Sequence, residues 1–301
     1  MGASDAVDRL TITRQFGRDN LVVEADIKGF CDTIAPGWLV RMVEERREDG
    51  AFLRRIKKWR KAGVVDTDGQ VRHPATGTPP GGSIAPILAH VYWHEALDLG
   101  CHNVVKPRWR GEACLIRYAE DVVGAVEDQA DAERFSREVG QRLGKFGREV
   151  AAGKTRVIPV TRPQGPGHTS FDFLGVEVRW GRDRAGKPHL KRRTSRKRRR
   201  NSRKRVTEWG KERCRHRLKD VFREVNAKVR GYDHDYGVNG NSARLHEFFT
   251  GARRILFKWL NRRSQRRSYT WTGFRDLLHH FRVERPHLVG RPPPRLAAGR
   301  A

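Results

Sequence analysis

The stretch Leu115–Val123, LIRYAEDVV, places two adjacent carboxylates between two apolar runs. Apolar runs bounded in this way are typical of buried strands. Two carboxylates inside a sheet core would be prohibitively costly, so Glu120 and Asp121 are expected at the tip of a β-hairpin. Held there with a third carboxylate from elsewhere, they would form the oxygen site that Mg²⁺ prefers. Taken alone, the stretch is also compatible with an ordinary acidic turn on the surface.

The chain of 301 residues is strongly basic, with 63 Lys and Arg residues, 35 Asp and Glu residues and a net charge of +28. Such a balance favours a polyanionic partner, with nucleic acid as the first candidate and an anionic membrane surface as the second. The sequence has no apolar run of membrane-spanning length and no signal-peptide pattern, so we expect no membrane partner and a cytoplasmic localisation. Four scattered cysteines without C-x-x-C spacing indicate neither a zinc site nor a disulfide framework.

A further strand is predicted at Leu21–Ile27, with Asp26 near its end. A loop dense in glycine and proline, 77–86, then enters a helix that continues to Leu97. Glycines at a helix entrance let backbone N–H groups approach a phosphate or a base pair, although a plain connecting loop has the same composition. Residue spacing also predicts helices over 36–62 and 128–146, hairpins over 64–74 and 171–178, and a strand over 157–160.

The composition changes beyond Gly181, and eleven of the residues from Lys191 to Arg205 are Lys or Arg. The chain from there to about Arg285 is predicted to be helical, with aromatic residues between the cations. Such aromatic side chains can stack on unpaired bases. The alternative, favoured for Phe222 and Trp259, is that they form the core of a helical bundle.

The order of these motifs resembles that of group II intron-encoded reverse transcriptase/maturases over about residues 20–285. Each motif alone is modestly specific, whereas all of them in this order are highly specific. The segments that carry the resemblance are Asp26–Phe30, Gly77–Gly82 with Pro86–Ala89, Tyr118–Asp121, Gly153–Thr155, Phe171–Gly175, Arg253–Gln265 and Ser268–Trp271.

The resemblance implies an α+β fold: a right-hand polymerase palm, which is an antiparallel sheet with packed helices, followed by an all-α maturase or thumb domain. Because only a short segment precedes Asp26, the chain is expected to be N-terminally truncated and to lack most of the fingers. The expected divisions are a leader and fingers remnant at 1–19, the palm at 20–180, a basic linker at 181–205, the helical maturase (thumb) domain at 206–288 and a disordered tail at 289–301.

The resemblance also implies RNA-directed DNA synthesis, in which two Mg²⁺ or Mn²⁺ ions assist the joining of a primer 3′-hydroxyl to a nucleotide α-phosphate. The expected metal ligands are Asp26, the Ile27 carbonyl, Glu120 and Asp121. Lys154 would protonate or stabilise the departing pyrophosphate, or would be an ordinary turn lysine. The expected partners are deoxynucleoside triphosphates, an RNA template with a DNA primer, and group II intron RNA.

Three further groups of site residues follow from the resemblance and the charge pattern. The nucleotide- and template-binding group is Phe30, Cys31, Pro80, Gly81 and Gly82, and the primer grip is Phe173, Leu174 and Gly175. The RNA-binding cations are Arg192, Arg193, Arg196, Lys197, Arg198, Arg262, Arg263, Arg266 and Arg267. So dense a cluster of one sign repels itself without a polyanion, although a solvated charged face is the alternative.

Five positions depart from the family pattern, among them Ala85 and His90, which replace a serine and an asparagine. Glu120 replaces an aspartate and moves the carboxylate outward by one methylene. Pro80 replaces a glutamine that contacts the nucleotide, and Cys31 replaces an aromatic residue that excludes a ribose 2′-hydroxyl. We therefore expect a weakened polymerase, with two alternatives: a non-catalytic RNA-binding splicing cofactor, or a decayed inactive remnant.

Overall fold

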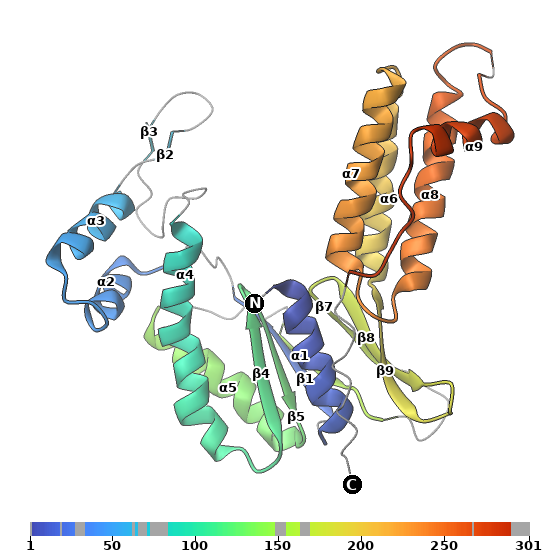
Figure 1. Cartoon of the computed structure of the whole chain (residues 1–301). Helices are drawn as coiled ribbons and strands as arrows, with labels where there is room; N and C mark the ends of the chain where they lie inside the picture. The colour runs from blue at the N-terminus through green and yellow to red at the C-terminus, as the bar shows by residue number, and fades with distance from the viewer. Residues whose placement is uncertain are drawn as a thin grey trace, which may run out of the picture. The chain divides into compact units, whose positions relative to one another are not determined.

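The computed structural model describes residues 2–18, 20–27, 34–61, 64–65, 71–72, 84–147, 155–162, 169–266 and 268–289, without the side chains of residues 26, 60, 61, 64, 65, 71 and 72 (Figure 1). Its contacts divide the chain into two compact units. We call Ile12–Arg162 the sheet unit, and Met1–Thr11 with Pro163–Ala301 the helical unit. No helix within the described ranges is long and apolar enough to cross a membrane.

The sheet unit contains a four-stranded antiparallel sheet in the order β4-β5-β1-β6. Its strands are β1 (Leu21–Asp26), β4 (Ala113–Tyr118), β5 (Asp121–Val126) and β6 (Arg156–Pro159). The inner strand β5 is buried along nearly its whole length. The predicted strands at 21–27 and 157–160 are thus confirmed to within a residue at each end.

Helices cover one face of this sheet. α4 (Ala85–Trp93) continues through two π-helical segments, η1 (His94–Asp98) and η2 (Cys101–Val105), and a 3₁₀ turn η3 (Lys106–Arg108). α5 (Gln129–Lys145) packs beside them, and Phe135 and Leu143 of α5 share one apolar cluster with Val122 of β5 and Leu97 of η1. A Cβ at Gly124 would lie 3.2 Å from the Phe135 ring, so the absence of a side chain there lets α5 approach β5 closely.

The helix predicted over 36–62 is in fact two helices, α2 (Pro36–Glu44) and α3 (Gly50–Lys61). The break has a local cause. The Asp49 carboxylate accepts hydrogen bonds from the N–H groups of Ala51 and Phe52, at 2.8 and 3.2 Å. Asp49 therefore caps a new helix instead of continuing the old one. The predicted hairpin that follows is confirmed by the pairing of β2 (Val64–Val65) with β3 (Val71–Arg72), while its expected Asp68-Gly69 turn lies outside the described residues.

The helical unit begins with a three-stranded antiparallel sheet and continues with four helices (Figure 1). The strands are β7 (Ser170–Phe173), β8 (Val176–Arg182) and β9 (Pro188–Thr194). The helices are α6 (Arg196–Arg213), α7 (Leu218–Tyr236), α8 (Ser242–Leu260) and α9 (Trp271–His280). α1 (Ala3–Phe16), which the sequence analysis treated as a leader, contains the division between the units at Thr11.

An apolar cluster and one buried amide hold the helical unit together. Phe222 of α7 is 1% exposed and stacks on Phe281 with ring centroids 4.5 Å apart. The Asn241 side chain, also 1% exposed, accepts from the Thr194 N–H at 2.9 Å and donates to the Thr194 hydroxyl and the Tyr236 carbonyl, both at 2.8 Å. Because Asn241 satisfies three polar groups at once, it joins β9 to the loop between α7 and α8.

The expected linker, 181–205, is instead regular structure containing the end of β8, all of β9 and the first half of α6. β8 pairs with β9 through seven residues, and Ser195 caps α6 by accepting from the Arg198 N–H. The helical unit therefore includes the sheet of residues 170–194 as well as the helices, and its division from the sheet unit falls at residue 162. The segment predicted to be all-α, 206–288, contains the second half of α6 and then α7, α8 and α9. The expected tail lies outside the described residues except for Val289.

Candidate active site and nucleic-acid interface

The adjacent acids lie on a two-residue hairpin turn. β4 and β5 pair up to Tyr118 and Asp121, which leaves only Ala119 and Glu120 between the strands. Ala119 has a φ of 51°, the left-handed conformation that such turns require at their first position. Glu120 is exposed and Asp121 is half-buried. The hairpin predicted from the sequence is confirmed, with its acids at the tip.

The third expected acid, Asp26, ends the neighbouring strand. β1 pairs with β5 so that Asp26 is opposite Asp121, and the Ile27 N–H donates to the Glu120 carbonyl at 3.1 Å. Directly opposed residues of antiparallel strands have Cα atoms about 4.5–5.5 Å apart. Strand pairing therefore brings together the backbones of three acids that lie far apart in the chain. The Asp26 side chain is outside the described part of the structure.

An ion pair under the hairpin ties it to the helical face of the sheet. Arg117 donates from Nε and Nη2 to the two carboxylate oxygens of Asp98, at 2.7 and 2.6 Å, and from Nη1 to the Ala119 carbonyl at 3.4 Å. The Arg117 side chain is only 9% exposed. Burial and the nearby Arg117 charge lower the pKa of His90, against an opposing effect of Asp98. We call the Arg117–Asp98 pair the hairpin latch.

A family model described as reverse transcriptase (RNA-dependent DNA polymerase) matches residues 4–178, more than half of the chain. The chain belongs to the reverse transcriptase family. The match includes β1, the β4–β5 hairpin and the latch, so the resemblance inferred from motif order is confirmed.

Proteins encoded in introns are among the relatives of this chain. Group II intron-encoded protein LtrA of Lactococcus lactis subsp. cremoris is 38% identical over 85 residues, which is 28% of this chain and 14% of LtrA. Protein YkfC of Escherichia coli is 26% identical over 196 residues, 56% of this chain and 49% of YkfC. The chain thus spans about half the length of YkfC and less of LtrA. A solved telomerase structure from Candida tropicalis matches with a TM-score of 0.48 at 13% identity, covering 93% of this chain and 48% of that one.

The donors at the hairpin are carboxylate oxygens, which fit hard ions such as Mg²⁺ or Mn²⁺. Glu120 and Asp121 supply such oxygens, and Asp26 ends on the strand beside them. Among the side chains that the structure describes, no group of three His, Cys, Asp or Glu residues could hold a metal ion. The Asp26 side chain is not among them, so this observation does not test the expected site of Asp26, Glu120 and Asp121. The metal ligands therefore stay a prediction that the donor chemistry fits.

Several predicted site residues lie outside the described residues, so their placement stays a prediction. These are Lys154, Phe30, Cys31, Pro80, Gly81, Gly82 and Arg267. Ile27 is described and is 4% exposed, and its backbone adjoins the hairpin turn.

The predicted primer grip forms the turn between β7 and β8. Phe173 is 3% exposed, and Leu174 and Gly175 have φ values of 52° and 81°. The Gly175 carbonyl accepts from the Ser195 N–H at 2.9 Å, and a Cβ at Gly175 would lie 2.9 Å from Cγ of Arg198. The turn is therefore packed against the start of α6. Its role in gripping a primer stays a prediction.

The predicted RNA-binding cations fall into two groups. Arg192 is paired with Asp8, and Arg193 forms two hydrogen bonds to Glu177 at 2.9 and 2.6 Å, a contact that raises the pKa of Arg193. Those two side chains already have structural partners. The exposed group comprises Arg196, Lys197 and Arg198 in the first turn of α6, Arg262 above the Trp259 ring, and Arg266; Arg263 is half-buried and donates to the His216 carbonyl.

Two features were missed by the sequence analysis. The first is the hairpin latch, although an arginine inside an apolar strand is a signal of a buried partner. The second is a set of three cations, Arg203, Arg254 and Lys258, that line one groove of the helical unit. The i,i+4 spacing of Arg254 and Lys258 puts them on one face of a helix, but no sequence pattern shows that this face meets Arg203.

Proposed function

We propose that this chain is an RNA-directed DNA polymerase whose basic helical unit binds RNA, and that group II intron RNA is the RNA it serves as a maturase. The observation that carries the proposal is the register that opposes Asp26 to Asp121 beside the Glu120 turn. Polymerases of this family bind their metal ions with carboxylates from distant segments of the chain. The β1–β5 pairing brings Asp26 next to Asp121 and Glu120 in this way. The family match and the intron-encoded relatives support the same reading.

In the proposed reaction a primer 3′-hydroxyl attacks the α-phosphate of a deoxynucleoside triphosphate. Asp26, Glu120, Asp121 and the Ile27 carbonyl would hold two Mg²⁺ or Mn²⁺ ions, which supply charge stabilisation at the attacking and leaving oxygens. The chain itself contributes positioning. The β1–β5 hydrogen bonds and the hairpin latch hold the acids on rigid elements, which keeps reactive geometry more precise than a free loop would. Lys154 would stabilise the departing pyrophosphate.

The decisive experiment is primer extension on an RNA template with a DNA primer, deoxynucleotides and Mg²⁺. Asp121→Asn keeps the shape of the side chain and removes its charge. We expect a loss of product on the order of a thousandfold, because metal-assisted charge stabilisation contributes several kcal/mol. Asp276→Asn is the matched control, since Asp276 is an exposed residue of α9. Equal activity of the two variants, or product from neither variant nor wild type, would rule out the proposal.

A second candidate is a non-catalytic RNA-binding protein that assists intron folding. Its support is the extra methylene of Glu120, since a displacement of about 1 Å at a reacting centre can reduce the rate ~10²-fold. RNA binding without any primer extension, in Mg²⁺ and in Mn²⁺, would favour this candidate. Filter binding of intron RNA that does not depend on the helical unit would exclude it.

A further inference from the structure

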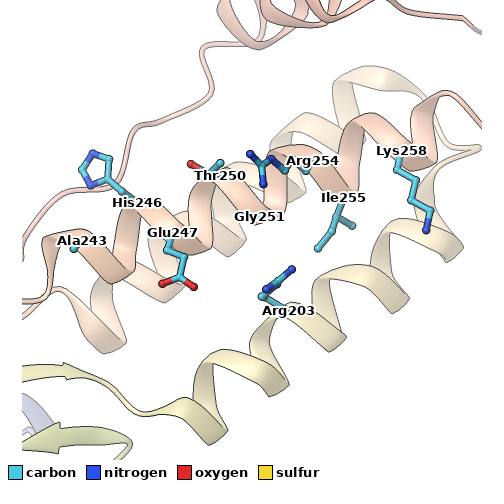
Figure 2. A pocket seen from close by; sticks show the side chains of 9 residues that line it. All are labelled: Arg203, Ala243, His246, Glu247, Thr250, Gly251, Arg254, Ile255 and Lys258. Carbon is cyan, nitrogen blue, oxygen red and sulfur yellow. The ribbon is translucent and has the colours of Figure 1, made fainter.

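Helices α6 and α8 of the helical unit enclose an open groove of about 520 Å³ (Figure 2). Its lining comprises Arg203 on α6 and Ala243, His246, Glu247, Thr250, Gly251, Arg254, Ile255 and Lys258 on α8. In Figure 2 the Arg203 side chain rises from α6 toward α8, and Lys258 extends from α8 toward α6. α8 supplies most of the groove lining, and α6 contributes Arg203 opposite it.

Most described cations of the helical unit lack an acidic partner, and the three cations of this groove are set apart because they line one groove together. Within the part of the chain that the structure describes, Arg203, Arg254 and Lys258 have no acidic partner, and all three are exposed. The one acid in the lining, Glu247, is bound by Arg244 at 2.6 Å and Arg199 at 2.8 Å. These contacts, the hydrogen bond from Arg244 first, lower the pKa of Glu247. The charge of Glu247 is already compensated, so it does not offset the three free cations.

The shape of the groove favours an extended ligand over a compact one. Contacts at Arg199–Glu247 and at Gly210–Trp259 show that α6 and α8 run side by side in the same direction. Arg254 and Lys258 are four residues apart, ~6 Å along α8. That separation is of the same order as the spacing of successive phosphates in a nucleic-acid strand. The groove floor is low because Gly251 has no side chain, and a Cβ there would lie 3.7 Å from Nε of Arg203.

We propose that the α6–α8 groove is a binding site for the sugar-phosphate backbone of an RNA strand. Arg203, Arg254 and Lys258 contact its phosphates, and the Thr250 hydroxyl donates to a phosphate oxygen. This site is distinct from the cations chosen from the sequence, and it rests on the proposed RNA-binding function of the helical unit. It does not depend on catalysis, because none of its residues belongs to the sheet unit.

The test measures binding of labelled single-stranded RNA to the full chain by fluorescence anisotropy, without nucleotides and with EDTA, over a series of salt concentrations. The groove variant is Arg203→Gln with Arg254→Gln. The slope of log K against log salt is negative, and each lost phosphate contact reduces its magnitude by about 0.7 for single strands. The groove variant should therefore have a slope about 1.4 less negative than that of wild type. The matched control, Lys204→Gln with Lys211→Gln, removes two charges from α6 at positions outside the lining. Equal falls in the two double variants would overturn the site, because they would show that only net charge matters.

A second variant changes shape without changing charge. Gly251→Leu fills the groove floor and replaces a helix-interior glycine, so it should leave the helix intact or stabilise it by ~1 kcal/mol. We expect at least a tenfold loss of RNA affinity with an unchanged or higher unfolding temperature. Unchanged affinity, or displacement of the RNA by inorganic phosphate at low millimolar concentration, would contradict a strand-binding groove. Asp121→Asn should bind RNA like wild type, so failure of the polymerase proposal and failure of the groove give different results.

Discussion

The acidic hairpin of the sheet unit and the cationic groove of the helical unit place their charges in opposite ways. At the hairpin, backbone pairing fixes where Asp26 and Asp121 stand, and the latch beneath them reaches the turn through the Ala119 carbonyl. In the helical unit, cations greatly outnumber acids, and ion pairs neutralise some of them. The difference teaches that strand register places the acids, whereas for the cations the decisive property is which unpaired side chains line the same groove.

The largest expected effect is a loss of folding stability in the helical unit that leaves the sheet unit unchanged. Phe222→Ala removes a ring that is 1% exposed in the core of the helical unit and should cost about 3–5 kcal/mol. Amide hydrogen exchange should then speed up in α7 and α8 and remain slow in the β1–β5 pairing. Trp271→Ala is the control, because Trp271 is 43% exposed and its stacking on Phe257 contributes only about 1 kcal/mol. Equal loss of protection in β1 and β5 would show that the two units unfold together.

A smaller effect should follow from loosening the hairpin latch. Arg117→Lys keeps the charge but loses the two-pronged contact with Asp98, so we expect about 1–2 kcal/mol less stability. Primer extension should fall about tenfold through kcat rather than KM, because the turn loses its support and not its substrate contacts. Arg156→Lys is the control, since Arg156 is 67% exposed in its pair with Glu24 and such pairs contribute ~0.5 kcal/mol. A change confined to KM would disprove the positioning role.

The smallest expected effect is a pH dependence in the helical unit. Burial raises the pKa of Asp233, although the His287 N–H hydrogen bond and the His287 charge act in the opposite direction. A carboxyl with a raised pKa binds more protons folded than unfolded, so stability should fall as pH rises from about 4 through the raised pKa. Urea unfolding at a series of pH values should show this slope, and Asp233→Asn should flatten it. An unchanged slope in the variant would mean that another group titrates.

Local sequence was enough to predict the elements whose signals are strong and short. The hairpin at Tyr118–Asp121 follows from apolar runs flanking two acids that no sheet core could accept. Helix α5 was predicted over 128–146 and spans Gln129–Lys145, with Gly147 at a φ of 67° just after its end. In these segments side-chain chemistry and backbone preference agree, so tertiary contacts had little to override.

The predictions were wrong in segments where a high content of charged residues obscured the strand pattern and the helix caps. The charge of 181–205 indicated a linker, but Leu190 and Thr194, four residues apart on one face of β9, are buried, and Ser195 caps the helix that follows. The sequence does not show that a cation such as Arg193 is paired, because its partner Glu177 lies on another strand. Asp49 lies inside the single helix predicted over 36–62, whereas its hydrogen bonds begin α3.

Residue order alone determined the family, the acid-bearing turn and the cationic character of the C-terminal half, because these depend on residue type and on spacing over a few positions. Only the tertiary structure decided that Asp26 stands opposite Asp121, that Arg117 finds Asp98, and that Arg203 faces the Arg254 side of α8. These residue pairs are formed by strand register and helix packing between segments that are distant in the sequence. Packing also decides which charges are neutralised and which remain available to a ligand.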